Sequence, residues 1–252
     1  MKVRIIKKSF LLLVSLSALL ACTAKKISKK EDQHYVINTE IIDSATYYTI
    51  QPYKQKMDLT MNDVIGNAET AFTKDQPEGN LGNFVCDCLF KKCKSYLGAD
   101  SVLLNGVILN NGGLRTSVPK GEVTVGRIFE LMPFDNELAM VELSGAKTKS
   151  MLYYLAEKGG MPVAGIRMEI ENSKPKNVLI NGVPFDETKH YYFISSDYLT
   201  NGGDKMDFFK NPVKITFLKK LIRDAIIEYC KEETKSGRNL KASLDGRIST
   251  AK

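Results

Sequence analysis

Hydrophobic residues recur at helical spacing in several parts of the chain. Residues 81–89 show this pattern and predict a helix that ends at Gly98, because glycine readily forms a left-handed cap. Residues 145–157 predict a second helix with one apolar face. Thr124 is a candidate N-cap for a short helix that Pro133 ends. The clearest amphipathic helix is predicted near the C-terminus from Ile215, Leu218, Leu221, Ile222, Ala225 and Ile226.

Other segments have the composition or alternation that is typical of strands. These segments are residues 101–110, 137–144, 165–172, 176–180 and 190–197. Asn181 and Gly182 form a dipeptide that favours a hairpin turn. Residues 35–58 read as an extended start that runs into a helix, and residues 62–72 as a strand or irregular segment. Strands and helices interleave, so we expect an α+β fold in which helices cover both faces of a mixed sheet.

The N-terminus has the pattern of a secretory signal peptide over residues 1–22, with basic residues followed by a short apolar run. Its end, LLAC, resembles a bacterial lipobox, which predicts lipidation at Cys22; the alternative is a plain signal peptide with an incidental cysteine. Residues 23–56 are expected to form a tether and an extended arm, and residues 57–252 the folded domain. We therefore expect a membrane-anchored lipoprotein of the cell envelope that faces the periplasm.

Charge and cysteine content narrow the classes of function. The net charge of +7 lies partly in the signal peptide and tether, and the remainder fits an anionic ligand or an acidic partner. No motif for a nucleic acid polymer is present. Buried free thiols are the favoured interpretation of the remaining cysteines, whose spacing matches no zinc site. They are Cys86, Cys88, Cys93 and Cys230.

Three turn segments combine glycines with polar or aromatic side chains. They are NNGGLR (110–115), PFDNEL (133–138) and SSDYLTNGGD (195–204), each next to a predicted strand. Ligands of layered α/β sheets gather at loops that leave strand ends. These segments are therefore the candidates for a binding site.

The same segments, in this order, resemble the C-terminal domain of the 5'-nucleotidase family. The resemblance runs from about residue 57 to residue 248 and rests on GNLGNFVCDCL, NNGGLR, GEVTVGRIFELMPFDNEL and SSDYLTNGGD. It implies a three-layer αβα domain that binds a nucleotide or nucleoside, while a separate metallophosphatase domain removes the phosphate. Its motifs imply that Phe134 and Tyr198 sandwich the base and that Asp204 accepts hydrogen bonds from the ribose hydroxyls. A Tyr198→Phe change, which keeps the aromatic face, is then expected to cost little.

The resemblance implies three further ligand contacts. Asn136 matches a residue at the base edge, Asn110 matches another site residue, and Arg115 matches an arginine that faces the phosphates. The chain departs from the family just before the LGN motif, where relatives often carry arginines that grip phosphate. Here the segment is TKDQPEGNLGN, in which Lys74 is nearby but out of clear register.

The sequence carries no recognisable catalytic centre of its own. It has two histidines, His34 and His190, and no motif for the ligands that a two-metal phosphatase needs. Ser195 and Ser196 lack the GxSxG elbow of a serine hydrolase. We therefore expect no catalytic residue, metal site or cofactor in this chain, with a divalent metal pair on a partner.

Three functional hypotheses remain. One is the nucleotide-binding part of a split 5'-nucleotidase that acts with a separate metallophosphatase. The second is a lipid-anchored protein that binds nucleotides or nucleosides without catalysis. The third is a scaffold whose pocket has decayed.

Overall fold

The computed structural model describes residues 43–251, so the predicted signal peptide, Cys22 and most of the tether lie outside the described residues. Contacts divide the chain into Met1–Tyr48 and Thr49–Lys252, and the layers below belong to the second unit. The helices are α2 (Ser44–Met61), α3 (Asn80–Leu97), α4 (Val125–Leu131), α5 (Gly145–Glu157), α6 (Asp197–Thr200) and α7 (Ile222–Lys235). Three short 3-10 helices are η1 (Gly98–Leu103), η2 (Gly203–Lys205) and η3 (Asp207–Phe209).

The strands of the described residues form three sheets. The strands are β1 (Val64–Ala68), β2 (Leu104–Ile108), β3 (Gly121–Thr124), β4 (Glu137–Ser144), β5 (Val163–Ala164), β6 (Ile166–Glu171), β7 (Lys174–Ile180), β8 (Val183–Pro184), β9 (His190–Ser196), β10 (Lys214–Leu221) and β11 (Ile248–Thr250). The central five-stranded sheet has the order β10-β4-β9-β2-β5. In it β2 and β9 run parallel and the other neighbours antiparallel, which confirms the predicted mixed sheet.

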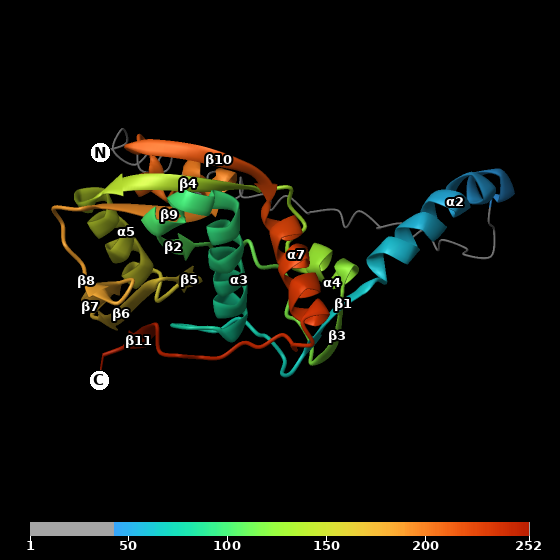
Figure 1. Ribbon diagram of the computed structural model, residues 1–252, viewed down its shortest axis with the longest axis horizontal. Coiled ribbons are helices and arrows are strands. Elements are labelled where there is room, and N and C mark those ends of the chain that lie inside the picture. The colour runs from blue at the N-terminus through green and yellow to red at the C-terminus, as the bar shows by residue number, and fades with distance from the viewer. Residues whose placement is uncertain (1–42, 252) are drawn as a thin grey trace, which may run out of the picture. The chain divides into compact units, whose positions relative to one another are not determined.

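The central sheet is the middle of three layers because successive side chains of its strands point to opposite faces. Leu138 and Met140 of β4 belong to a core shared with α3, α4 and α7, whereas Val141 and Leu143 belong to a core shared with α5. In Figure 1 α3 and α7 lie beside each other, apart from α5. The predicted three-layer αβα arrangement is confirmed.

The layer that contains α5 also includes a second sheet, with the order β11-β6-β7-β8. The predicted turn at Asn181 and Gly182 joins β7 to β8, and both residues have positive φ, 51° and 76°. Asn172 and Ser173 form a similar turn between β6 and β7. Sequence patterns predicted these strands without separating them from the central sheet.

The predicted C-terminal helix is too long at its start. Ile215, Leu218 and Leu221 lie in β10, and α7 begins only at Ile222. Residues 214–217 pair with β4 in antiparallel register, so tertiary pairing overrides the helical spacing. Three lysines (Lys214, Lys219 and Lys220) lie on this edge strand, where charge discourages further pairing.

Two other predicted boundaries also move. The strand expected over residues 101–110 begins at Leu104, because Val102 and Leu103 belong to η1 and are exposed. The helix expected toward residue 58 begins at Ser44 and ends at Met61. Thr124 caps α4 as predicted, its hydroxyl accepting from the backbone N–H of Arg127 at 3.2 Å.

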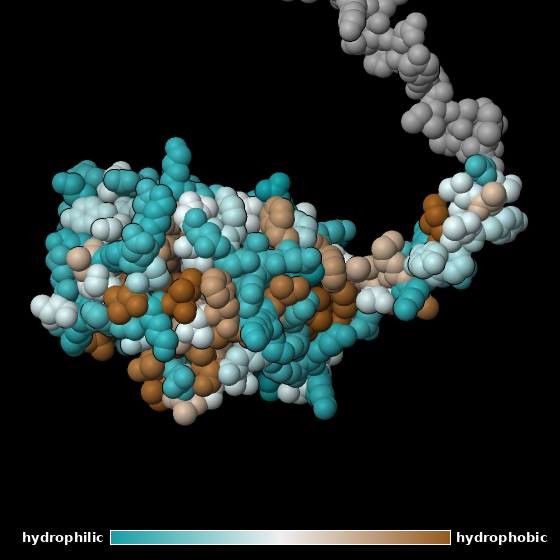
Figure 2. All heavy atoms as spheres, turned by 90° about the horizontal axis from the view of Figure 1, so that it is seen from above, coloured by the Kyte–Doolittle hydropathy of each residue, from teal (hydrophilic) through white to brown (hydrophobic). Residues whose placement is uncertain are grey.

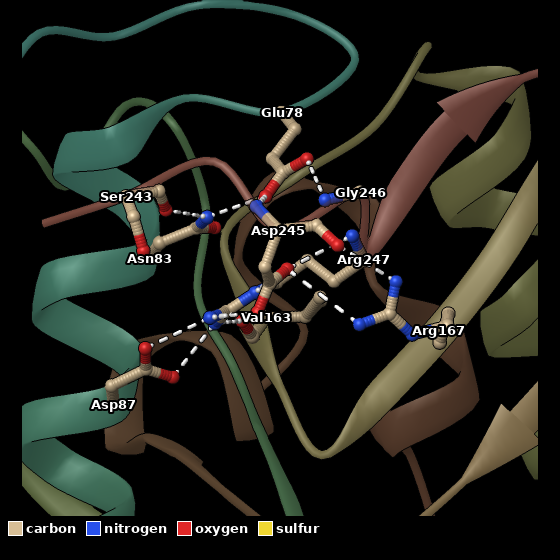
Figure 3. Close-up of polar contacts among 9 residues, drawn as sticks. All are labelled: Glu78, Asn83, Asp87, Val163, Arg167, Ser243, Asp245, Gly246 and Arg247. Carbon is tan, nitrogen blue, oxygen red and sulfur yellow. Dashed lines mark hydrogen bonds and ion pairs between the residues drawn. The ribbon is translucent and has the colours of Figure 1, made fainter. Parts of the chain in front are cut away.

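Polar contacts fasten the segment after α7 to the rest of the domain (Figure 3). The Arg247 guanidinium donates to both Asp87 carboxylate oxygens, at 2.7 and 2.8 Å, and to Asp245 at 2.9 Å. Glu78 accepts from the backbone N–H of Asp245 at 2.9 Å and from the Asn83 amide at 2.6 Å. Because Asp87 and Asn83 lie on α3, these contacts bring the chain end back to pair with β6 through β11.

The four cysteines of the described domain are buried free thiols, as predicted, and burial is the main cause that raises their pKa values.

Between residues 43 and 251, no helix combines the length and apolar character that crossing a bilayer requires.

Candidate nucleotide-binding site

The topology of the central sheet brings the three candidate loops to the same end of its strands. NNGGLR follows β2, and SSDYLTNGGD begins with the last two residues of β9 and continues beyond it. Because β2 and β9 are parallel neighbours, both loops leave the same end of the sheet. PFDN precedes β4, which is antiparallel to β9, and Leu138 pairs with Ser196. The start of β4 therefore lies beside the end of β9. Segments far apart in the sequence thus form one site.

The loop after β2 supplies Asn110 and Arg115. A Cβ on Gly113 would lie 2.7 Å from the Asn110 side-chain oxygen, so a larger residue there would displace that amide from its present position. The Asn110 amide nitrogen then donates to an Asp204 carboxylate oxygen at 2.6 Å. The Arg115 side chain donates to the Gly112 carbonyl at 3.2 Å and remains exposed.

The loop after β9 supplies Tyr198 and Asp204. The Tyr198 ring lies against Gly203, where an added Cβ would approach the ring within 2.5 Å. The Tyr198 hydroxyl donates to the second Asp204 carboxylate oxygen at 2.9 Å. Asp204 thus receives one hydrogen bond from each of two loops, and this pairing orients its carboxylate.

The loop before β4 presents Phe134, and Arg223 of α7 holds this loop. The Arg223 side chain is buried and donates to the carbonyls of Met132, Pro133 and Phe134 at 3.3–3.5 Å. It also pairs with Asp135 at 2.5 Å. Arg223 is not among the residues predicted from the sequence, because no local signal links it to Asp135, which lies 88 positions away.

All six predicted binding residues line one cavity of about 310 Å³. They are Asn110, Arg115, Phe134, Asn136, Tyr198 and Asp204, joined by Gly112 and Gly113. The volume lies at the lower end of the range typical of small-molecule sites, about 300–1,000 Å³. The structure therefore brings the six predicted residues together around one cavity, and their part in binding a ligand stays a prediction.

The two aromatic walls of this cavity are half exposed, with Phe134 at 48% and Tyr198 at 49%. Exposure alone does not mark a site, since hydrophobic residues (brown) lie in several groups among hydrophilic ones on the face drawn in Figure 2. What distinguishes these two rings is that both line a cavity that also holds a carboxylate and a guanidinium. Aromatic faces bind planar groups by stacking, and a carboxylate accepts hydrogen bonds from hydroxyls.

Two cationic side chains contact or belong to the NNGGLR loop, and one of them, Arg115, lines the cavity. The Arg115 guanidinium carbon lies 6.0 Å from the centre of the Phe134 ring. Lys74, which does not align clearly with the phosphate-binding arginines of the family, donates from its ammonium group to the carbonyl of Leu114 at 3.0 Å. Arg115 would attract an anionic group such as phosphate to the cavity, whereas Lys74 contacts the same loop without lining the cavity.

No metal centre is found in the described part of the chain, and the two serines of SSDYLTNGGD have a structural role. Among residues 43–251, no three His, Cys, Asp or Glu side chains gather closely enough to hold a metal ion. Ser195 is fully buried and donates to the carbonyl of Ile108 at 2.9 Å, while Ser196 caps α6 by accepting from Leu199. Both hydroxyls thus stabilise the end of β9.

A three-layer domain whose strand ends carry an aromatic-walled cavity belongs to the class of layered α/β domains that offer room for a small planar group. Comparison with known proteins names the family: the chain belongs to the 5'-nucleotidase C-terminal domain family, whose model matches residues 64–211. It is accordingly a domain of the nucleotide-binding type.

Several relatives support this assignment. The chain is 27% identical over 220 residues to the trifunctional nucleotide phosphoesterase protein YfkN of Bacillus subtilis, covering 79% of this chain and 14% of the relative. It is 26% identical over 188 residues to the 5'-nucleotidase of Vibrio parahaemolyticus, covering 69% of this chain and 31% of the relative. The crystal structure of the 5'-nucleotidase precursor from Thermus thermophilus matches with a TM-score of 0.66 and 25% identity, covering 82% of this chain and 43% of that one. This chain therefore spans less than half the length of each of these proteins.

Proposed function

We propose that this chain is the nucleotide- or nucleoside-binding part of a split 5'-nucleotidase that acts in nucleotide breakdown with a separate metallophosphatase. The observation that carries the proposal is the cavity in which two aromatic rings, the Asp204 carboxylate and the Arg115 guanidinium converge. Family membership adds support, as do relatives whose names describe 5'-nucleotidases.

Each group at the cavity has a part in holding the ligand. Phe134 and Tyr198 stack on the base, and Asn136 contacts its edge. Asp204 accepts hydrogen bonds from the ribose hydroxyls through lone pairs that Tyr198 and Asn110 leave available. Arg115 pairs with the phosphate by charge-assisted hydrogen bonds. The metallophosphatase partner would supply a pair of divalent metal ions, which activates the water that attacks phosphorus.

Binding is tested by titration calorimetry of the purified domain with AMP, adenosine and adenine. We expect AMP to bind more tightly than adenosine, because Arg115 contacts phosphate, and adenosine more tightly than adenine, because Asp204 contacts ribose. A protein that binds none of them while remaining folded would overturn the proposal.

The partnership is tested by capturing the full-length protein from its native membrane fraction and assaying the eluate for AMP hydrolysis. We expect hydrolysis that a metal chelator abolishes. An eluate without activity, combined with tight AMP binding by the domain, would favour the alternative of a nucleotide-binding protein without catalysis.

The proposal includes anchoring at the cell envelope through a lipid on Cys22, with the domain facing the periplasm. Attachment is tested by fractionation: Cys22→Ser should move the protein from the membrane to the soluble fraction, because acyl chains on one residue supply the anchor. Identical fractionation of variant and wild type would contradict the anchor.

A further inference from the structure

Asp204 occupies an unfavourable backbone conformation at the centre of the proposed ribose site. Asp204 and Lys205 both have positive φ, 52° and 61°. Non-glycine residues avoid this region because Cβ approaches the backbone, so two in succession persist only where surrounding contacts hold them. Gly202, two residues before Asp204, has a φ of 90° and lets the chain enter the turn, but it does not by itself hold the turn in place.

One contact that holds this turn comes from α5. The Tyr154 hydroxyl donates to the backbone carbonyl of Asp204 at 2.7 Å. The Tyr154 ring is itself fixed by an edge-to-face contact with Phe208, at 5.5 Å between ring centres. The hydrogen bond therefore starts from a packed side chain and ends on the peptide that directs the Asp204 carboxylate.

The carboxylate needs this direction, because it must meet groups from two loops at once. Its two oxygens lie 2.6 Å from the Asn110 amide nitrogen and 2.9 Å from the Tyr198 hydroxyl. If the turn changed its backbone dihedrals at Asp204, Cβ and the attached carboxylate would move relative to both donors. Resting on the proposed function, we infer that Tyr154 is a positioning residue for ribose recognition, which holds the Asp204–Lys205 turn through the Asp204 carbonyl.

The state of the Tyr154 hydroxyl suits this role. Partial burial, and then the charge of Asp204, raise the pKa of Tyr154 above its usual value. The hydroxyl therefore stays protonated and able to donate at neutral pH.

The first test measures ligand binding by Tyr154→Phe, which keeps the ring packed on Phe208 and removes only the hydroxyl. We expect the affinity for adenosine to fall about three- to tenfold and the affinity for adenine to stay unchanged. Tyr153→Phe is the matched control, since Tyr153 is the neighbouring residue on α5 and is 40% exposed. This variant should bind both ligands as wild type does. Equal loss for adenosine and adenine would indicate a general structural role and overturn the inference.

A double-mutant cycle decides whether Tyr154 acts through Asp204. In the Asp204→Asn background, where ribose contacts are already weakened, Tyr154→Phe should change adenosine affinity by less than twofold. Fully additive effects of the two substitutions would contradict action through Asp204.

A ligand-free measurement separates this inference from the proposed function. Amide hydrogen exchange of Gly203, Asp204 and Lys205 should be faster in Tyr154→Phe than in wild type or Tyr153→Phe, because the turn opens more often. If wild type binds no nucleoside, the proposed function fails while the exchange rates still report on the turn. If adenosine binds but neither its affinity nor the exchange rates change in Tyr154→Phe, the inference alone fails.

Discussion

Removing the Tyr198 ring or only its hydroxyl separates two contributions to nucleoside binding. The ring is 49% exposed and lines the cavity, so a base that stacks on it covers one aromatic face. Stacking on an aromatic side chain contributes about 1–3 kcal/mol per base. We therefore expect Tyr198→Ala to weaken adenosine binding about five- to more than a hundredfold.

The hydroxyl contribution follows from its contact with Asp204. Tyr198→Phe keeps the stacking face but removes a donor 2.9 Å from the carboxylate. A solvent-accessible hydrogen bond of this kind contributes about 0.5–1.5 kcal/mol, so adenosine affinity should fall about two- to twelvefold. Adenine affinity should stay unchanged, because adenine has no ribose. The small cost expected from the sequence is the lower end of this range, and the contact with Asp204 allows a larger one.

Calorimetry of both variants with adenosine and adenine checks this reasoning. Tyr53→Ala, which removes a tyrosine that is 76% exposed on α2, is the control and should leave both affinities unchanged. If Tyr198→Ala retains wild-type affinity for adenosine and its unfolding midpoint, Tyr198 is a structural turn residue and the base sandwich is wrong. If Tyr198→Phe loses adenine affinity, the ring rather than the ribose contact has been disturbed.

Three further predictions concern charged residues. Arg115→Ala should weaken AMP binding by about 1.5–3 kcal/mol and leave adenosine binding unchanged, because its proposed partner is the phosphate; equal losses in calorimetry would contradict this. Arg223→Met should lower the free energy of unfolding by about 2–4 kcal/mol and weaken adenosine binding, because the Phe134 loop loses its donor; an unchanged urea midpoint would show that the loop holds itself. The pKa of Glu233 is lowered from 4.5 to about 2, and the hydrogen bond from the Arg238 guanidinium is the largest cause. Because the pKa of Glu233 is lower in the folded state, its ionised carboxylate stabilises the fold above about pH 4.5, and this stabilisation is lost as the pH falls toward 2. The free energy of unfolding of Glu233→Gln should therefore depend less steeply on pH in this range. An unaltered pH profile in acid titrations would refute the assignment.

The sequence determined the elements whose pattern is local. Helix α3 ends at Gly98, which has a positive φ of 55°, Thr124 caps α4, and Asn181–Gly182 forms a hairpin turn, since each depends on a few neighbouring residues. The six candidate site residues were predicted because their motifs, in family order, resemble known ones. Periodicity by itself assigned none of them a role.

Tertiary structure decided what depends on distant parts of the chain. Ile215 and Leu218 have helical spacing but lie in β10, because pairing with β4 outweighs a weak local preference. Arg223 supports the Phe134 loop only because α7 packs beside it, and Tyr154 reaches Asp204 only because α5 lies near the loop after β9. Such contacts join residues that are many positions apart, and packing forms them only after the layers assemble. The sequence therefore specifies the groups that line the site, whereas the packed layers specify the contacts that hold these groups in place.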